Sequence, residues 1–208
     1  MESIKKGGAS APSILNQFQI VVFGLESRKD RWERCKEIFN DAGVEKVTRY
    51  TTIKDNNDTH RHCAKDFLAL LGLKKGSILF FEDDFELCEG WDNVLEKALK
   101  DLPQDYDLLY LGGNLTKKPE RVTDNLLRVK GAWMFHAVLI SDKFRKYILC
   151  NYDYNKIWVF DEWCRVNAPK LKFYMTYPMI SYQREGYSDF QKKEIYYDIF
   201  NNEYYKRV

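Results

Sequence analysis

The sequence lacks the motifs of the commonest catalytic families. No HExxH, GxSxG, Walker-A or GxGxxG pattern occurs in its 208 residues, which excludes the most frequent protease, hydrolase, NTPase and dinucleotide-binding functions. Histidine is scarce, at three residues, and the His and Asp clusters typical of metal-dependent phosphohydrolases are missing. Hydrolysis of a phosphate ester is therefore a weaker hypothesis than transfer or binding.

Paired cysteines and long apolar runs are missing too. The five cysteines are odd in number and show no CxxC spacing, which disfavours a zinc or disulfide framework and favours a reducing, cytoplasmic location. No segment reaches the apolar length of a membrane span, and the polar first residues have no signal-peptide core. We expect a flexible N-terminal tail over residues 1–16 and a single domain over residues 17–208.

A strong charge of either sign is also absent. The formal net charge is +2, so the chain lacks the basic footprint of a dedicated nucleic-acid binder. Aromatic residues are abundant, with 14 Tyr and 13 Phe. Tyrosine at this density suits clefts that stack against rings and bind hydroxyl groups, although much of it belongs in a core.

The chain alternates between β-rich runs and helical patterns. Strands are predicted over residues 19–24, 47–53, 77–82 and 107–111, and helices over 27–42, 58–71, 91–100 and 141–149. This alternation predicts an α/β sandwich with a mainly parallel central sheet flanked by helices. The second half is less regular, with a late strand expected over residues 171–177.

The run from Ser77 to Asp84 is the most informative segment. Four apolar residues predict a strand buried on both faces, and the strand ends in Glu82, Asp83 and Asp84. Three adjacent carboxylates repel one another, so a positive partner is expected, and a divalent cation that also binds substrate phosphates is the simplest. The alternative is a solvated acidic turn after a core strand.

Other candidate site residues are scattered along the chain. Arg28 and Arg31 open the first helix, where they could hold a phosphate or simply pair with neighbouring acids. Asp161, between aromatic residues, is a candidate general base or an ordinary acid of a helix N-terminus. Gln183 and Ser188 lie in a polar, aromatic loop that either positions substrate or merely turns.

The histidines indicate a functional site less strongly than the acids and arginines do. His60 and His62 precede a predicted helix, and either could face a cleft. His136 lies between apolar residues, which favours a satisfied core side chain over a metal ligand.

The order of these features resembles the family 25 glycosyltransferases, which include bacterial lipooligosaccharide and collagen-type galactosyltransferases. Arg28 and Arg31 match the "Leu-x-x-Arg-x-x-Arg" opening, and Glu82-Asp83-Asp84 resembles the family's form of the DxD motif. The segments over residues 131–141 and 178–189 fall in the family's order as well. The resemblance extends over residues 19–190.

The resemblance implies a GT-A fold, a nucleotide-sugar donor that is usually UDP-linked, and a divalent ion, typically manganese, with magnesium as a second choice. Asp84 would be the direct metal ligand, with Glu82 as the other outer acid. Asp161 would take the proton from the acceptor hydroxyl in an inverting displacement. The remaining donor contacts would come from Arg28, Arg31, Asp83, Gln183 and Ser188.

One element departs from the family pattern. Where the family carries "Gly-Cys-x-x-Ser-His", this chain reads His62-Cys63-Ala64-Lys65-Asp66-Phe67, which keeps the cysteine and loses the Ser-His pair. Either His62 replaces the missing histidine in space, or the donor contacts differ. The identity of the sugar is therefore open.

The predicted function is transfer of a sugar from a nucleotide diphosphate to a hydroxyl of a glycan or lipooligosaccharide. Two alternatives stay open. The acceptor could be a hydroxymethylated DNA base, since the pI is about 8.1 and residues 143–147 and 204–207 mix basic and aromatic side chains. The chain could also bind nucleotide sugars without turnover.

Overall fold

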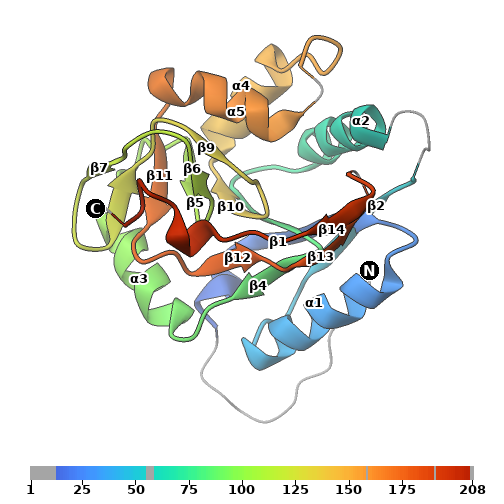
Figure 1. Cartoon of the computed structure of the whole chain (residues 1–208), viewed down its shortest axis with the longest axis horizontal. Helices are drawn as coiled ribbons and strands as arrows, with labels where there is room; N and C mark the ends of the chain where they lie inside the picture. The colour runs from blue at the N-terminus through green and yellow to red at the C-terminus, as the bar shows by residue number, and fades with distance from the viewer. Residues whose placement is uncertain (1–12, 55–58, 158, 190, 207–208) are drawn as a thin grey trace.

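A central eight-stranded sheet organises the protein (Figure 1). The computed structural model describes residues 13–54, 59–157, 159–189 and 191–206. The strand order is β2-β1-β3-β10-β5-β11-β8-β7. In chain order these strands are β1 (Gln19–Leu25), β2 (Thr48–Thr52), β3 (Ile78–Glu82), β5 (Leu108–Tyr110), β7 (Glu120–Arg121), β8 (Leu126–Arg128), β10 (Ala137–Ile140) and β11 (Phe173–Thr176).

The sheet is mixed but mainly parallel. β1 pairs in parallel with β2 and β3, and β5 pairs in parallel with β11. β10 is inserted antiparallel between β3 and β5, and β8 lies antiparallel to β11 and β7. Only β10 and β8 run against the other six strands, which confirms the predicted α/β class with a mainly parallel sheet.

Helices cover both faces of the sheet (Figure 1). α1 (Lys29–Asp41) and α3 (Trp91–Asp101) contribute to one apolar cluster. α2 (Thr59–Leu73), α4 (Asp142–Asn151) and α5 (Phe160–Asn167) contribute to the other. Short 3₁₀ helices lie at Ile14–Gln17 (η1), Ala168–Lys170 (η2) and Ile199–Asn201 (η3).

The apolar run of β3 supplies both clusters because successive side chains of a strand point to opposite faces. Ile78 and Phe80 belong to the cluster under α2, while Leu79 and Phe81 belong to the cluster under α1. All four side chains are buried. The continuous hydrophobicity of this segment thus follows from helices on both sides.

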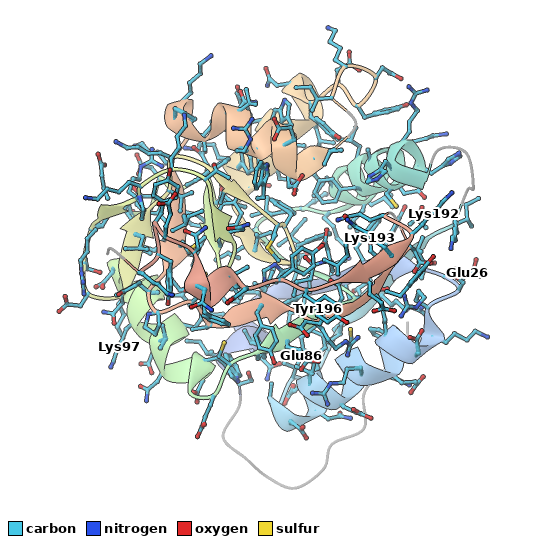
Figure 2. The ribbon with its side chains drawn as sticks, in the orientation of Figure 1. Glu26, Glu86, Lys97, Lys192, Lys193 and Tyr196 are labelled. Atoms are coloured by element: carbon cyan, nitrogen blue, oxygen red, sulfur yellow. The ribbon has the colours of Figure 1, made fainter. Side chains whose placement is uncertain are left out.

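Short strand pairs surround the end of the sheet where β3 finishes. They are β4 (Phe85–Leu87) with β12 (Ser181–Gln183), β13 (Gly186–Ser188) with β14 (Lys193–Ile195), and β6 (Asn114–Leu115) with β9 (Ala132–Trp133). Charged side chains such as Glu26, Lys97 and Lys192 lie exposed at the periphery (Figure 2). Most of these short strands come from the second half of the chain, which also supplies β8, β10 and β11 to the central sheet.

Two details of the first segments differ from expectation. Leu15 in η1 is fully buried, so folded structure begins ahead of the expected boundary at residue 17, while residues 1–12 lie outside the described ranges. The helix predicted from residue 27 begins only after Arg28, its N-cap residue, whose side chain makes no cap hydrogen bond. Residue 58, where the next helix was predicted to begin, lies outside the described residues.

All five cysteines are free thiols. Across the described ranges, no helix has the length and hydrophobicity needed to cross a lipid bilayer.

Candidate active site

The three acids lie in the tight connection between β3 and β4. Glu82 ends β3, Asp83 and Asp84 form the turn, and β4 begins at the next residue. The neighbouring strand β1 makes room for this turn at Gly24, where a Cβ atom would lie only 2.1 Å from Asp83 Oδ2. A glycine at this position allows the acidic turn to approach the sheet closely.

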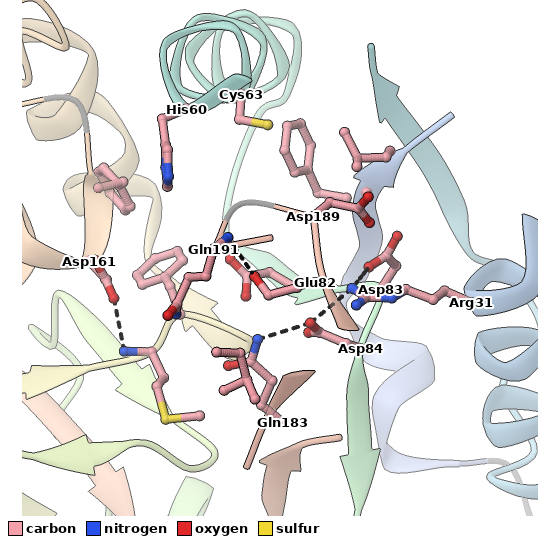
Figure 3. Close-up of a pocket in the computed structure, with 18 of the residues that line it drawn as sticks. Arg31, His60, Cys63, Glu82, Asp83, Asp84, Asp161, Gln183, Asp189 and Gln191 are labelled. Atoms are coloured by element: carbon pink, nitrogen blue, oxygen red, sulfur yellow. Dashed lines mark hydrogen bonds and ion pairs between the residues drawn. The ribbon is translucent and has the colours of Figure 1, made fainter. Parts of the chain in front are cut away.

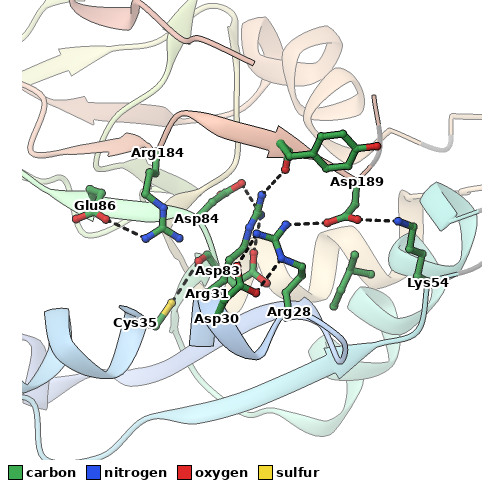
Figure 4. A network of polar contacts seen from close by, with 12 residues as sticks. Arg28, Asp30, Arg31, Cys35, Lys54, Asp83, Asp84, Glu86, Arg184 and Asp189 are labelled. Carbon is green, nitrogen blue, oxygen red and sulfur yellow. Dashed lines mark hydrogen bonds and ion pairs between the residues drawn. The ribbon is translucent and has the colours of Figure 1, made fainter. Parts of the chain in front are cut away.

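Arg31 holds the acidic turn from α1 (Figures 3 and 4). Its Nη1 donates to Asp83 Oδ1 at 2.9 Å and to Asp84 Oδ2 at 3.0 Å, and its Nη2 donates to the Tyr187 carbonyl at 2.9 Å. Gln183 Nε2 donates to the same Asp84 Oδ2 at 2.9 Å. Asp84 Oδ1 is buried and has no hydrogen-bond partner within the described part of the chain.

Arg28 and Lys54 converge on Asp189 (Figure 4). Arg28 Nη1 lies 2.9 Å from Asp189 Oδ2, and Lys54 Nζ lies 2.7 Å from Asp189 Oδ1. Burial acts to raise the pKa of Asp189, but the hydrogen bonds from the two cations outweigh it and the pKa is lowered. The two predicted arginines therefore lie beside the acidic turn, and both are bound to carboxylates.

Asp161 lies in the first turn of α5, across the cavity from the acidic turn in the view of Figure 3. Its Oδ2 accepts a hydrogen bond from the Met134 amide at 3.2 Å. Burial raises the pKa of Asp161 above its ordinary value. A carboxylate with a raised pKa is a better proton acceptor than a solvated one.

One cavity of about 420 Å³ collects every site residue predicted from the sequence. This volume lies in the range of small-molecule sites. The predicted residues lining it are Arg28, Arg31, Glu82, Asp83, Asp84, Asp161, Gln183 and Ser188. Residues separated by up to 160 positions in the chain thus meet at one place.

The cavity also contains side chains that the sequence did not single out. Asn114, Trp133, Gln191 and Tyr197 line it. They lie in rim strands and loops without a regular pattern, so no periodicity marks them. Asp189 belongs to the loop considered above, but its two cationic partners depend on tertiary structure.

The acidic turn carries a strong negative field. Burial, followed by the charges of Asp84, Asp161 and Asp83, raises the pKa of Glu82 well above its ordinary value. Burial and the charge of Asp84 raise the pKa of Asp83 to about 6, despite the opposing effect of Arg31. A cation beside these carboxylates would favour their ionised forms.

The donor set suits a divalent ion that shares its ligands with substrate. Among the residues that the structure describes, no group of three or more His, Cys, Asp or Glu side chains is arranged to hold a metal. The unpartnered oxygen of Asp84 and the neighbouring Glu82 nevertheless match an ion bound through one or two carboxylates and completed by phosphate and water.

His60, one of the two histidines expected near a cleft, lines the cavity, and His136 lies in the core as expected. His60 and Cys63 line the cavity, whereas His62 is not among its lining residues. His136 is fully buried, and burial lowers its pKa to about 4, which keeps the ring neutral. Its carbonyl accepts from the Glu82 amide at 2.8 Å, so His136 supports the backbone of the acidic turn.

Comparison with known proteins gives distant structural likenesses, of which two are described here. No protein-family model and no curated protein sequence matches the chain. A197 from STIV is 14% identical, with 85% of this chain and 93% of that chain covered and a TM-score of 0.45. A Drosophila β-1,4-galactosyltransferase 7 in complex with manganese, UDP-Gal and xylobiose is 14% identical. The match covers 92% of this chain and 80% of that chain, with a TM-score of 0.48.

Proposed function

We propose that the chain is a glycosyltransferase that moves a sugar from a nucleotide diphosphate, with UDP-sugars as the first candidates, to an acceptor hydroxyl. The observation that carries the proposal is the convergence of the acidic turn, two arginines and Asp161 on one cavity. The order of the sequence motifs supports a GT-A fold of the family 25 type. A cytoplasmic location is part of the same proposal.

The donor diphosphate would bind between α1 and the acidic turn. Arg28 and Arg31 offer guanidinium groups, which match phosphate oxygens in pairs. In the structure they bind carboxylates instead, so donor binding exchanges carboxylate partners for phosphate. Gln183 and Ser188 line the same cavity and offer further hydrogen bonds.

Asp84, with Glu82, would hold a divalent ion, manganese or magnesium. When bound, such an ion supplies Lewis-acid stabilisation of the charge on a leaving diphosphate. Asp83 keeps Arg31 beside these oxygens through its ion pair of 2.9 Å.

Asp161 would act as the general base. The acceptor oxygen attacks the anomeric carbon, the bond from that carbon to the diphosphate oxygen breaks, and the acceptor proton passes to Asp161. Its amide contact with Met134 fixes one carboxylate oxygen, and its burial keeps its pKa raised. This arrangement corresponds to an inverting displacement.

A nucleotide-release assay tests the proposal. The full chain is incubated with UDP-, GDP- and CMP-sugars, with and without manganese, and free nucleotide is measured with water or a glycan as acceptor. Metal-dependent release from one donor class is expected. Donor binding without release to any acceptor would favour a non-catalytic binding module, and no response to any nucleotide would overturn the proposal.

A further inference from the structure

A second, open cavity of about 410 Å³ adjoins the first. It is lined by Trp133, Lys156, Ile157, Val159, Asp161 and Glu162. Three of these residues, Trp133, Val159 and Asp161, also line the first cavity. The two cavities therefore meet at the proposed base, with the acidic turn lining only the first.

Trp133 is the exposed aromatic side chain at this junction. Its relative exposure is 44%, although large aromatic rings are usually buried. The indole is fixed in place, because Nε1 donates to Glu162 Oε2 at 3.1 Å and the Arg165 guanidinium lies 5.8 Å from the ring centroid. Arg165 is itself bound to both oxygens of Glu162, at 2.6 and 2.5 Å.

This ring is also tied to the proposed base through the backbone. The next residue, Met134, donates its amide to Asp161 Oδ2 at 3.2 Å. A ligand that rests on the indole therefore lies beside the carboxylate that would receive its proton. The ring is held rigidly from two sides, so it loses little conformational entropy when a ligand binds.

The charges around the second cavity disfavour a nucleic-acid acceptor. Asp161 and Glu162 line it, and the one basic side chain among its described lining residues, Lys156, lies 3.5 Å from Asp153. A DNA acceptor needs cations for its phosphates, which dominate the affinity of such complexes. An uncharged ring with hydroxyl groups fits an aromatic surface bordered by carboxylates.

We propose that the second cavity is the acceptor subsite and takes a neutral saccharide, with the C–H face of a sugar ring stacked on Trp133. This inference rests on the proposed transfer reaction and names its acceptor class. Trp133 binds the ring, while Glu162 and Arg165 position the indole. A sugar on this surface presents a hydroxyl toward Asp161 at the boundary of the two cavities.

The experiment measures binding of neutral disaccharides (lactose, maltose, cellobiose and xylobiose) to the full chain by NMR titration in the presence of UDP and manganese. UDP binding is measured separately by calorimetry. The variants are Trp133→Ala, Trp133→Phe and, as a control, Leu73→Ala. Leu73 is 74% exposed at the end of α2 and lines neither cavity.

At least one disaccharide is expected to bind the wild type, with at least tenfold weaker affinity in Trp133→Ala, partial retention in Trp133→Phe and no change in Leu73→Ala. Thermal unfolding shows whether each variant folds.

Equal disaccharide affinity in wild type and Trp133→Ala, or no binding by any of the four sugars, would overturn the inference about the acceptor. If UDP still bound in that case, the proposed donor site would be unaffected. Trp133-dependent binding of a duplex containing hydroxymethylated bases, rather than of sugars, would also overturn it. If UDP does not bind to the wild type, the proposed transfer reaction is contradicted.

Discussion

Glu86 and Asp84 are two buried carboxylates, two residues apart, with opposite surroundings. Both oxygens of Glu86 are bound to arginine, with Arg34 Nε and Nη2 at 3.0 and 2.8 Å. Arg184 Nη1 lies 3.2 Å from Glu86 Oε1 (Figure 4). Asp84 shares Arg31 with Asp83 and keeps one buried oxygen without a hydrogen-bond partner in the described structure. Glu86 does not line the main cavity, whereas Asp84 does.

The comparison separates an acid that stabilises the fold from an acid that is available to a ligand. A carboxylate with every oxygen paired contributes to folding and has no capacity left for binding. A carboxylate beside two others, with one free oxygen, costs folding energy that a bound cation can recover. Substitutions at the cavity and in the fold distinguish these two roles.

Replacing the proposed base has the largest expected effect. Asp161→Asn keeps an oxygen that can accept from the Met134 amide but cannot take a proton. We expect turnover to fall by about 10²–10⁴-fold, the usual contribution of a general base. Initial rates and UDP affinity are measured together. Unchanged turnover would remove Asp161 from the reaction, and a parallel loss of UDP affinity would indicate a disrupted site.

Filling the space next to the acidic turn tests its position. In Gly24→Ala the new methyl group would lie 2.1 Å from Asp83 Oδ2, so the Asp83 side chain must move away from Arg31. We expect at least tenfold weaker UDP affinity by calorimetry. Gly72→Ala is the control, since a Cβ there meets nothing within 4 Å and lies in helix α2. Equal affinities in both variants would show that donor binding does not depend on the placement of Asp83.

Removing the charge of Asp83 is expected to stabilise the protein at alkaline pH. Its pKa is raised from 3.8 to about 6, so the folded state binds a proton more tightly than the unfolded state does. Wild-type stability is therefore lost as pH rises from about 4 through 6. Asp83→Asn has no charge at this position and does not lose this stability. Relative to the wild type, its free energy of unfolding is expected to be higher by up to about 3 kcal/mol above pH 6, and the difference disappears below pH 4. Denaturant unfolding at pH 4 and pH 8 measures it, and a gain independent of pH would contradict the assignment.

Neutralising Glu86 is expected to have the smallest effect on function. Glu86→Gln weakens the ion pairs with Arg34 and Arg184, and because Arg34 is 44% exposed the cost is about 1 kcal/mol in the free energy of unfolding. UDP affinity is expected to stay within twofold. Chemical denaturation and calorimetry check the two values, and a large loss of UDP affinity would place Glu86 in the donor site.

Local patterns predicted the parts of the fold that depend on local chemistry. The apolar run of β3, the helical spacing of α1 and the exit of β3 into three acids all follow from neighbouring residues. Pairing order is not local, which is why the antiparallel insertion of β10 between β3 and β5 was not foreseen. The pattern predicted a helix from residue 27, but the helix begins after Arg28, whose side chain binds Asp30 and Asp189.

The candidate site shows the same limit. Its carboxylates and arginines carry chemistry that stands out in sequence, and all of them line one cavity. The contact of Lys54 with Asp189 joins residues 135 positions apart, and Trp133 is held by a side chain 29 positions away. Such contacts arise from the assembled rim of the sheet, so no short sequence pattern predicts them.

Calorimetric titration of UDP, with and without manganese, into the wild type, Asp84→Asn and Glu86→Gln tests whether the acidic turn binds the donor and the metal. We expect metal-dependent UDP binding that is retained in Glu86→Gln and at least a hundredfold weaker in Asp84→Asn, with both variants folded. Equal binding in all three proteins, or weakening in Glu86→Gln alone, would contradict the assignment of the acidic turn as the donor and metal site.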